Sequence, residues 1–311
     1  MPPILLVKVG ECGEVSDILI LHASANELHT ATRHSVIPAD YFQAKNSLRI
    51  AESVMNIQLK KFDPRTMADD KVCVFIGKRG TGKSTLITDV LYYKKHLPAG
   101  IVMSATEDGN HHYKSFVPDL CIYGDYDRDA IERVLDRQKS IAIKNKTPPG
   151  AFLLLDDCMY DRKFMKDVCI RQCFMNGRHW KIFFMLSMQY CMDLTPDLRA
   201  NVDYVFILRE NIVQNREKLY KAFFGIFPHF QMFQKVMDAC TENYECLVLD
   251  NTKHSNKIED CVFWYRAAIR KNFKCCSPQL WSMHKQRYDP NHAQKGPAKP
   301  STTAAKVTKL S

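Results

Sequence analysis

The sequence predicts an α/β fold in which helices flank a mostly parallel β-sheet. From Lys71 onward, short apolar runs alternate with amphipathic stretches. Strands that are separated by helices pair in parallel through crossover connections. A glycine-rich turn also stands between the first of these runs and the first helical stretch. We expect three parts: a small β-rich lead-in at 1–65, an α/β domain at 66–272 and a basic tail at 273–311.

The expected elements follow from the spacing of apolar residues. The lead-in holds two short apolar runs, at 4–9 and 18–21, without a helical period. The α/β domain holds seven expected strands, which are VCVFIG, IVMSAT, CIYG, AFLLLDD, KIFFMLSMQ, YVFILRE and CLVLD. Five helices are expected between them, at 83–96, 127–146, 162–178, 216–224 and 229–240. Gly225 and Pro228 separate the last two helices, because both residue types end helices.

Composition indicates a folded protein with excess positive charge. Of the 311 residues, 46% are hydrophobic and 25% are charged, which suffices for one large core or two smaller ones. The chain has 44 Lys and Arg against 34 Asp and Glu, a net charge of +10 that favours a polyanionic partner. No run reaches the roughly 18 to 20 apolar residues of a membrane helix. The first residues also lack a secretory signal pattern, so we expect neither a membrane span nor secretion.

The cysteines are expected to be reduced core residues. The chain has 12 of them, and several lie inside apolar runs, as Cys73 does. The closest groupings, Cys169 with Cys173 and Cys275 beside Cys276, lack the paired spacing of a zinc site. Reduced thiols are typical of the cytosol or of a compartment continuous with it.

The end of the chain differs in composition from the rest. From Lys285, the last 27 residues hold six basic residues and one acidic residue, with several Pro, Ala, Ser and Thr and no apolar period. This pattern is typical of a disordered segment, and we expect the basic tail to be disordered.

The segment GKRGTGKS at 77–84 fits the phosphate-binding pattern G-x-x-x-x-G-K-[ST], with an apolar strand before it and a helix after it. The glycines let backbone N–H groups surround the β- and γ-phosphates at a helix N-terminus, where the helix dipole favours negative charge. We expect Lys83 to add a point charge and Ser84 to ligate Mg²⁺, which makes ATP and Mg²⁺ the expected cofactors. The expected nucleotide-binding residues are Gly77, Lys78, Arg79, Gly80, Thr81, Gly82, Lys83, Ser84 and Thr85.

Two later strands end in polar side chains that suit hydrolysis. The apolar run at 151–155 is followed by Asp156 and Asp157. We expect Asp156 to hold Mg²⁺ through water and Asp157 to polarise the attacking water as general base. The run that ends at Met188 is followed by Gln189, which can sense the γ-phosphate or orient that water. A strand-end Asp can instead cap a helix, but the position after a phosphate loop favours catalysis. For Gln189, an ordinary strand-end polar residue stays an alternative.

Hydrolysis in ring-forming ATPases of this kind requires a cation from a neighbouring subunit. Arg178 lies just before the strand that ends at Met188 and is the first candidate, with Arg199 second and Arg209 third. Each of these arginines can also be a surface residue or an internal ion-pair partner.

The motifs GKRGTGKS, FLLLDD, FFMLSMQ and LTPDLRANVDYVFILRE together resemble the DNA-packaging ATPases of large nucleocytoplasmic DNA viruses, the poxvirus-type branch of the FtsK/HerA superfamily. The resemblance covers about 58 to about 267. It implies an additional-strand, RecA-like P-loop core that forms a homo-oligomeric ring and uses ATP to drive double-stranded DNA into a capsid. Its further implied partner is a capsid or portal protein, and its implied locations are the host cytoplasm at the site of virus assembly and the virion.

The resemblance also carries residue roles. Lys83 and Ser84 match the nucleotide-binding pair of the family, Asp156 and Asp157 match its magnesium and base positions, and Gln189 matches its polar sensor. One position departs from the family pattern. Cellular FtsK/HerA pumps usually carry Glu after the metal-binding Asp, whereas Asp157 is one methylene shorter, so its role as base requires a closer water.

Two other functions remain open from the sequence. A P-loop kinase of a small molecule requires a lid with clustered arginines, and no compact lid is evident. A nucleotide-gated DNA-binding scaffold would tolerate Asp157→Asn, whereas a motor would be trapped with bound ATP. Candidate DNA contacts are the segment 111–114, which combines a cation with an aromatic ring and can also be an ordinary exposed loop, and the tail. The tail can instead bind capsid protein or keep the protein soluble.

Overall fold

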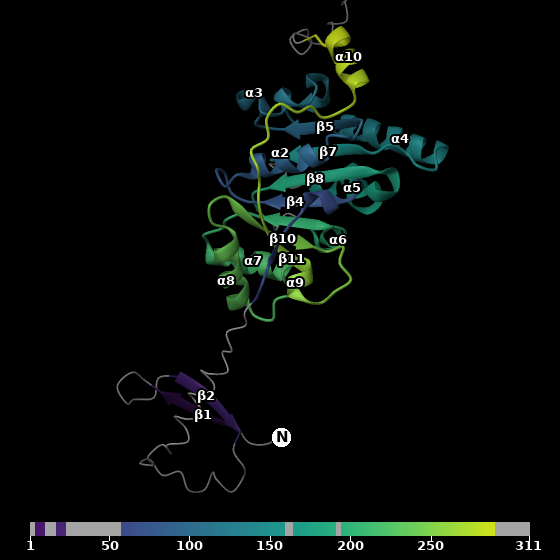
Figure 1. Ribbon diagram of the computed structural model, residues 1–311. Coiled ribbons are helices and arrows are strands. Elements are labelled where there is room, and N and C mark those ends of the chain that lie inside the picture. Colours follow the sequence, from purple (N-terminus) through teal and green to yellow (C-terminus); the bar gives the residue numbers. More distant parts are fainter. Residues whose placement is uncertain (1–3, 10–16, 23–56, 159–163, 191–193, 290–311) are drawn as a thin grey trace, which may run out of the picture. The chain divides into compact units, whose positions relative to one another are not determined.

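The computed structural model describes residues 4–9, 17–22, 57–158, 164–190 and 194–289. The chain divides into two units, Met1–Asn56 and Ile57–Ser311. In the first unit, β1 (Ile4–Val9) and β2 (Asp17–His22) form an antiparallel pair (Figure 1). These strands correspond to the two apolar runs of the predicted lead-in.

The second unit is built on a nine-stranded sheet with the order β3-β11-β10-β9-β4-β8-β7-β5-β6. Six neighbouring strands run parallel to one another. They are β4 (Val72–Ile76), β5 (Ala99–Ser104), β6 (Ile122–Tyr123), β7 (Ala151–Asp156), β8 (Ile182–Met188) and β9 (Tyr204–Ile207). Strand β8 stands between β4 and β7, which is the additional-strand arrangement that the resemblance implied. The predicted class, α/β with a mostly parallel sheet flanked by helices, is confirmed.

The remaining strands extend the sheet beyond β9. Strand β10 (Glu245–Asp250) is antiparallel to β9, β11 (Val262–Arg266) is antiparallel to β10, and β3 (Lys60–Lys61) is parallel to β11. The sequence predicts β10 as a strand but not its direction, and it predicts neither β11 nor β3. Because β10 reverses the chain, its first residue lies at the edge of the sheet where β4, β7 and β8 end.

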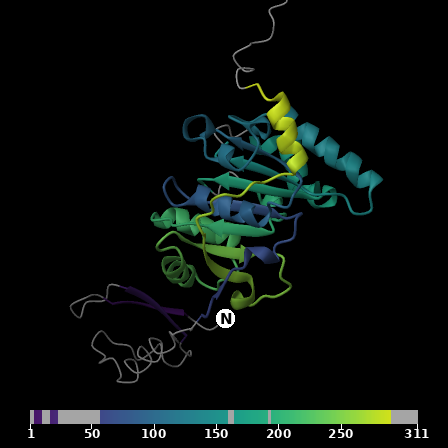
Figure 2. The same cartoon turned by 45° about the horizontal axis from the view of Figure 1, so that its top comes forward.

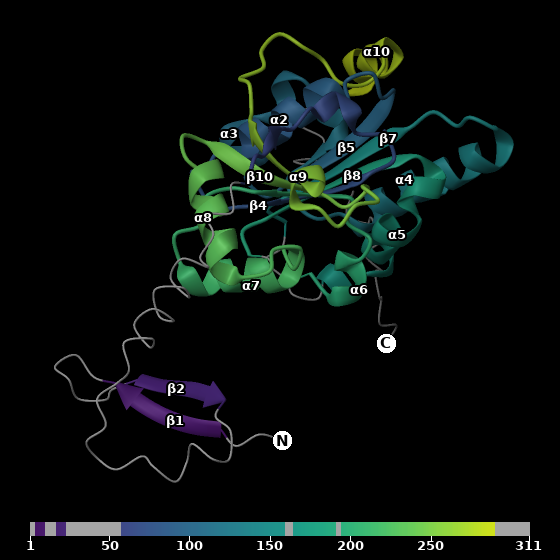
Figure 3. The same ribbon diagram turned by 60° about the horizontal axis from the view of Figure 1, so that its bottom comes forward.

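Helices cover both faces of the sheet. In Figure 3, α2 (Lys83–Tyr93) and α10 (Pro278–Arg287) lie on one face, and α5 (Val168–Asn176), α6 (Pro196–Arg199) and α7 (Val213–Phe223) lie on the other. The other α-helices are α3 (Glu107–Asn110), α4 (Arg128–Lys144), α8 (Phe230–Cys240) and α9 (Ile258–Cys261). Strands β4, β7 and β8 are buried throughout, because a strand covered on both faces reads as a continuous apolar run.

The predicted helices are present with shifted ends. Helix α4 begins after Asp127, whose side chain accepts a hydrogen bond from the backbone N–H of Ala130 at 2.9 Å. The predicted helix at 162–178 is shorter in the structure, because Asp167 caps α5 by accepting from the backbone N–H of Cys169 at 2.7 Å. The first part of that predicted helix falls partly on 159–163, which lie outside the described residues.

The second unit extends past both predicted limits of the α/β domain. Before 66, Phe62 is 4% exposed and packs edge-on against Tyr204 and Phe206. After 272, Phe273 and Cys275 are buried and α10 follows, although the sequence predicts a disordered tail from 273. The basic residues of 273–311 predict a tail, whereas Phe273, Cys275 and Cys276 at its start contribute side chains to the core. Residues 290–311 lie outside the described residues, so their disorder stays a prediction.

The segment 267–277, which we call the strap, joins β11 to α10 along the α2 face of the sheet (Figures 1 and 2). Near its start, the N–H of Ala268 donates to the Asp89 carboxylate on α2 at 2.9 Å. Near its end, the N–H of Cys275 donates to the carbonyl of Phe116 at 2.8 Å. The strap therefore passes from the edge of the sheet near β11 over α2 toward β5.

The ten cysteines within the described residues are buried and free. Burial raises the pKa of the Cys121 thiol to about 12, and it raises the pKa of Cys73 as well. These thiols are therefore neutral core side chains, as the sequence predicts. Separately, none of the helices in the described parts of the chain has the length and apolar character needed to cross a lipid bilayer.

Candidate nucleotide-binding site

The loop between β4 and α2 owes its tight curve to glycines. Gly80 and Gly82 have φ of +78° and +98°, a left-handed conformation that residues with a side chain rarely adopt. A Cβ atom on Gly77 would lie 2.8 Å from the Thr81 hydroxyl oxygen and 2.9 Å from Leu208 Cβ. The Thr81 hydroxyl also donates to the carbonyl of Lys78 at 2.7 Å. Gly77 and Thr81 thus shape the loop, which leads directly into the first turn of α2.

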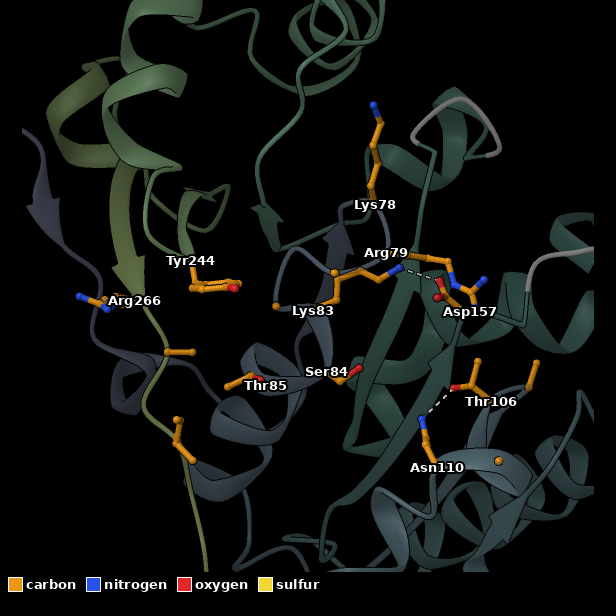
Figure 4. A pocket seen from close by; sticks show the side chains of 16 residues that line it. Lys78, Arg79, Lys83, Ser84, Thr85, Thr106, Asn110, Asp157, Tyr244 and Arg266 are labelled. Atoms are coloured by element: carbon orange, nitrogen blue, oxygen red, sulfur yellow. Dashed lines mark hydrogen bonds and ion pairs between the residues drawn. The ribbon is translucent and has the colours of Figure 1, made fainter.

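Three predicted catalytic residues meet beside this loop. Lys83 is 6% exposed, and its Nζ lies 2.7 Å from Asp157 Oδ1 (Figure 4). The Gln189 amide nitrogen donates to Asp157 Oδ2 at 3.3 Å. Asp157 has a φ of +52°, a left-handed backbone conformation that is uncommon for residues other than glycine. The three residues converge because β4, β8 and β7 are neighbours that end at one edge of the sheet.

Asp156, the predicted magnesium residue, is buried and accepts a hydrogen bond from the Tyr113 hydroxyl at 2.7 Å. Burial raises the pKa of Tyr113 well above its ordinary value, and the charge of Asp156 adds to this, so the hydroxyl stays a neutral donor. The backbone N–H groups of Tyr113 and Lys114 donate to the buried Glu107 carboxylate at 3.0 Å. The prediction that 111–114 presents a ring to DNA is therefore wrong for Tyr113, which is 1% exposed and donates to the buried Asp156 carboxylate.

The same segment supports the Ser84 end of the site. The Thr88 hydroxyl donates to the carbonyl of Ser84 at 2.7 Å, and it lies 2.8 Å from His112 Nε2. Because the Thr88 hydroxyl hydrogen is engaged with that carbonyl, the hydroxyl oxygen accepts a hydrogen bond from the Nε2–H group of His112. Ser84 itself is exposed beside the Lys83–Asp157 pair.

A cavity of about 970 Å³ opens at this edge of the sheet. Seven of the nine predicted nucleotide-binding residues line it, namely Lys78, Arg79, Gly80, Gly82, Lys83, Ser84 and Thr85, and so does Asp157, the predicted base. A second group of residues, which the sequence pattern does not predict, lines the cavity away from Asp157 and consists of Tyr244, Arg266, Ala267 and Ile269. Tyr244 directly precedes the antiparallel β10, and Arg266 is the last residue of β11. Finding them from the sequence requires the directions of these two strands.

Lys78 is held away from the Lys83 side of the loop. Its Nζ lies 2.6 Å from Glu210 Oε1, just beyond β9. Burial alone would raise the pKa of Glu210, but hydrogen bonds from Lys78 and from the backbone N–H of Ile212 outweigh it and leave the pKa below its usual value. Glu210 is therefore an anion that anchors the Lys78 side chain at one wall of the cavity.

Arg178 lies at the other edge of the sheet, before β8, and does not approach Lys83 of its own chain. Its guanidinium is 3.5 Å from Asp203, whose carboxylate also accepts from the backbone N–H of Val72 at 2.9 Å. Arg199 precedes β9 at that same edge, whereas Arg209 follows β9 at the edge that carries the loop. Any contact of Arg178 with a nucleotide requires a second subunit.

No protein-family model matches the chain. Over 246 residues the chain is 39% identical to an uncharacterized protein of Acanthamoeba polyphaga mimivirus, and the match spans 76% of this chain and 86% of that protein. Over 201 residues it is 42% identical to an uncharacterized protein of Frog virus 3, which spans 64% of this chain and 62% of that protein. Among solved structures, the chain is similar to the genome packaging NTPase of Sulfolobus turreted icosahedral virus 2 in complex with AMP. That similarity has a TM-score of 0.49 and 17% identity and covers 65% of this chain and 100% of the other.

Proposed function

We propose that this chain, which belongs to the family of large-DNA-virus proteins that includes the mimivirus relative, is an ATP-hydrolysing motor that moves double-stranded DNA into capsids. The observation that carries the proposal is the meeting of Lys83, Asp157 and Gln189 beside a phosphate-binding loop. A phosphate loop, a strand-end acid pair and a strand-end glutamine form the set that nucleotide hydrolysis requires.

The proposed base, Asp157, forms an ion pair with the lysine of the phosphate-binding loop. The two charged atoms, Lys83 Nζ and Asp157 Oδ1, are 2.7 Å apart, and Lys83 belongs to the loop that binds phosphate. When ATP binds, the γ-phosphate takes the Lys83 ammonium, and Asp157 is released to accept a proton from the attacking water. Gln189, which already contacts Asp157, orients that water. Nucleotide binding thus activates the base by removing its partner.

The oxygen ligands near Ser84 suit Mg²⁺. Hard divalent cations prefer hydroxyl, carboxylate and water oxygens, and Ser84 with Asp156 supplies the first two. When bound, Mg²⁺ neutralises charge on the β- and γ-phosphate oxygens. Tyr113 orients the Asp156 carboxylate through its 2.7 Å hydrogen bond, so this carboxylate is preorganised before the metal arrives.

The motor is proposed to work as a homo-oligomeric ring, with Arg178 of one subunit completing the site of the next. The Arg178 side chain is 46% exposed, so it is accessible to a neighbour. Arg199 and Arg209 remain the second and third candidates. The net charge of +10 suits double-stranded DNA, whose phosphates are bound without regard to sequence. The proposal includes a capsid or portal protein as partner, and the host cytoplasm and the virion as locations.

The first test measures steady-state ATP hydrolysis with and without long double-stranded DNA, for the wild type and for Asp157→Asn. We expect DNA to stimulate the wild type, and Asp157→Asn to lower turnover by about a hundredfold or more while ATP binding is retained, because loss of a general base removes that factor. Light scattering on the same samples should detect a ring-sized species. If the protein were a stable monomer and its ATP turnover did not change with DNA, the result would contradict the motor and favour a kinase.

Replacement of Tyr113 by Phe should change the metal requirement of the enzyme. Without the hydroxyl, the Asp156 carboxylate loses its 2.7 Å hydrogen bond, and we expect the Mg²⁺ concentration for half-maximal turnover to rise about tenfold. Turnover at saturating Mg²⁺ should recover most of its wild-type value. The matched control is Tyr288→Phe, at an exposed tyrosine outside the cavity, which should leave the Mg²⁺ dependence unchanged. Equal Mg²⁺ dependence in the two variants would exclude the orienting role of Tyr113.

A further inference from the structure

The cavity continues past the phosphate loop to an end that the proposed hydrolysis does not use. In Figure 4, Asp157 and Thr106 lie on one side of the cavity, Tyr244 and Arg266 lie on the other, and Thr85 lies between them. The phosphates of a bound nucleotide occupy the Asp157 side, where Lys83 and Ser84 lie. The Tyr244 side is therefore available to the rest of the nucleotide.

Tyr244 stands at this end in an unusual conformation. It is 69% exposed, and it has a φ of +63° directly after Asn243 with a φ of +49°. The two residues form the centre of a tight turn with positive φ at both positions, closed by the Glu245 N–H, which donates to the carbonyl of Glu242 at 2.8 Å, so the turn fixes where Tyr244 stands before β10. A Cβ on Gly82 would lie 3.3 Å from Tyr244 Cδ1, so the ring rests against the glycine that ends the phosphate loop. The Tyr244 ring therefore lies directly beside the phosphate-binding loop.

The strap adds apolar side chains to the lining of the same cavity. Ile269 is 79% exposed, a large fraction for an isoleucine, and Ala267 lies beside it in the strap. An exposed aromatic ring and an exposed aliphatic side chain that face one cavity leave apolar area in contact with water. A flat heteroaromatic ring that enters this end of the cavity would remove apolar area from water.

We propose that Tyr244, Ala267 and Ile269 form the subsite for the nucleobase of the nucleotide whose phosphates the loop binds. This inference rests on the proposed nucleotide binding. Tyr244 stacks on the face of the base, and the two strap residues add apolar contacts at the same end of the cavity. Stacking on a ring face tolerates different bases, because every base has a π-face. The subsite thus contributes affinity for a base and not for the phosphates.

The strap holds this subsite in place relative to the loop. The buried Asp89 of α2 accepts from the Ala268 N–H at 2.9 Å and from Arg270 Nε at 2.6 Å, so the residues on both sides of Ile269 are anchored to one carboxylate. The same carboxylate accepts from the Tyr265 hydroxyl at 2.5 Å. Because α2 begins with Lys83, the base subsite and the phosphate site share one rigid element.

The test measures the affinity of the full chain for two ligands by isothermal titration calorimetry in Mg²⁺. Mg·ATP carries a base, and inorganic tripolyphosphate does not. We expect Tyr244→Ala to weaken ATP binding about tenfold and to leave tripolyphosphate binding unchanged, because a stacked base is lost. Tyr244→Phe should retain wild-type affinity for both ligands. The control Tyr288→Ala, at an exposed tyrosine away from the cavity, should also bind both normally.

The outcomes separate the subsite from the nucleotide site itself. Wild-type ATP affinity in Tyr244→Ala would overturn the base subsite, and the proposed ATPase would stand if Lys83→Ala still lost ATP. Equal loss of ATP and tripolyphosphate in Tyr244→Ala would also overturn it, since the ring would then support the phosphate loop. Failure of the wild-type chain to bind either ligand would reject both proposals.

Discussion

Lys83→Ala is expected to lower ATP turnover by at least about a hundredfold, since preorganised charges at developing negative charge contribute factors of this size. The Lys83 ammonium is buried at the start of α2 and is the loop's point charge for phosphate. The substitution also leaves Asp157 without its 2.7 Å ion-pair partner. We therefore expect ATP affinity to fall as well, in steady-state turnover and in calorimetric titration of the same protein.

The matched control removes a lysine of the same region that faces solvent. Lys95 is exposed just past the end of α2, where its ammonium lies over the Tyr92 ring at 4.3 Å. Lys95→Ala lowers the net charge by the same amount and should keep wild-type turnover. Similar kinetics of the two variants would mean that net charge, and not the loop, explains any loss. Wild-type affinity and turnover in Lys83→Ala would reject the phosphate-loop assignment.

Asp89→Ala is expected to produce the largest loss of stability among the polar sites of the second unit. Asp89 is 0% exposed and accepts hydrogen bonds from Arg270, Tyr265 and the backbone N–H of Ala268. Alanine leaves three donors without their acceptor. The Arg270 side chain is 23% exposed, so water can replace part of its lost hydrogen bonding and limits the loss. We therefore expect the free energy of unfolding to fall by about 3 kcal/mol.

Urea or thermal denaturation measures this change, with Asp136→Ala as control. The Asp136 side chain is 66% exposed and pairs with Lys139 at 3.4 Å on the surface of α4. Its loss should alter the free energy of unfolding by less than about 0.5 kcal/mol. If Asp89→Ala unfolded at the same denaturant concentration as Asp136→Ala, the strap would not be anchored as described.

The central part of the fold follows from the sequence because its signals are local. Each parallel strand is a short apolar run, and the glycine pattern of 77–84 fixes both the loop and the start of α2. The sequence predicts Lys83, Asp157 and Gln189 as residues of one catalytic site, because each follows a strand of the same parallel sheet. The structure brings these three together within hydrogen-bond distance.

Other features depend on information that the pattern does not carry. An apolar run reads the same in either direction, so the reversal of β10, and with it the position of Tyr244, was not predicted. Tyr113 lies between His112 and Lys114, and a polar setting of this kind favours an exposed loop. Its burial comes from two long-range partners, the Asp156 carboxylate and the Glu107 side chain that binds its backbone.

The reversed strand also determines when a ligand can bind during folding. The cavity is lined by residues from 78–85, from 105–110, from Asp157 and from 244–269, so it is complete only after the last strands have joined the sheet. Contacts across such long stretches of chain form late, because closing long loops costs entropy before it is repaid. A partly synthesised or truncated chain that ends before β10 thus lacks the base subsite and gains less from the nucleotide than the finished unit does. A ligand that fills the whole cavity shifts the folding equilibrium toward the finished unit, by about 2.7 kcal/mol at a free concentration of 100 times its Kd.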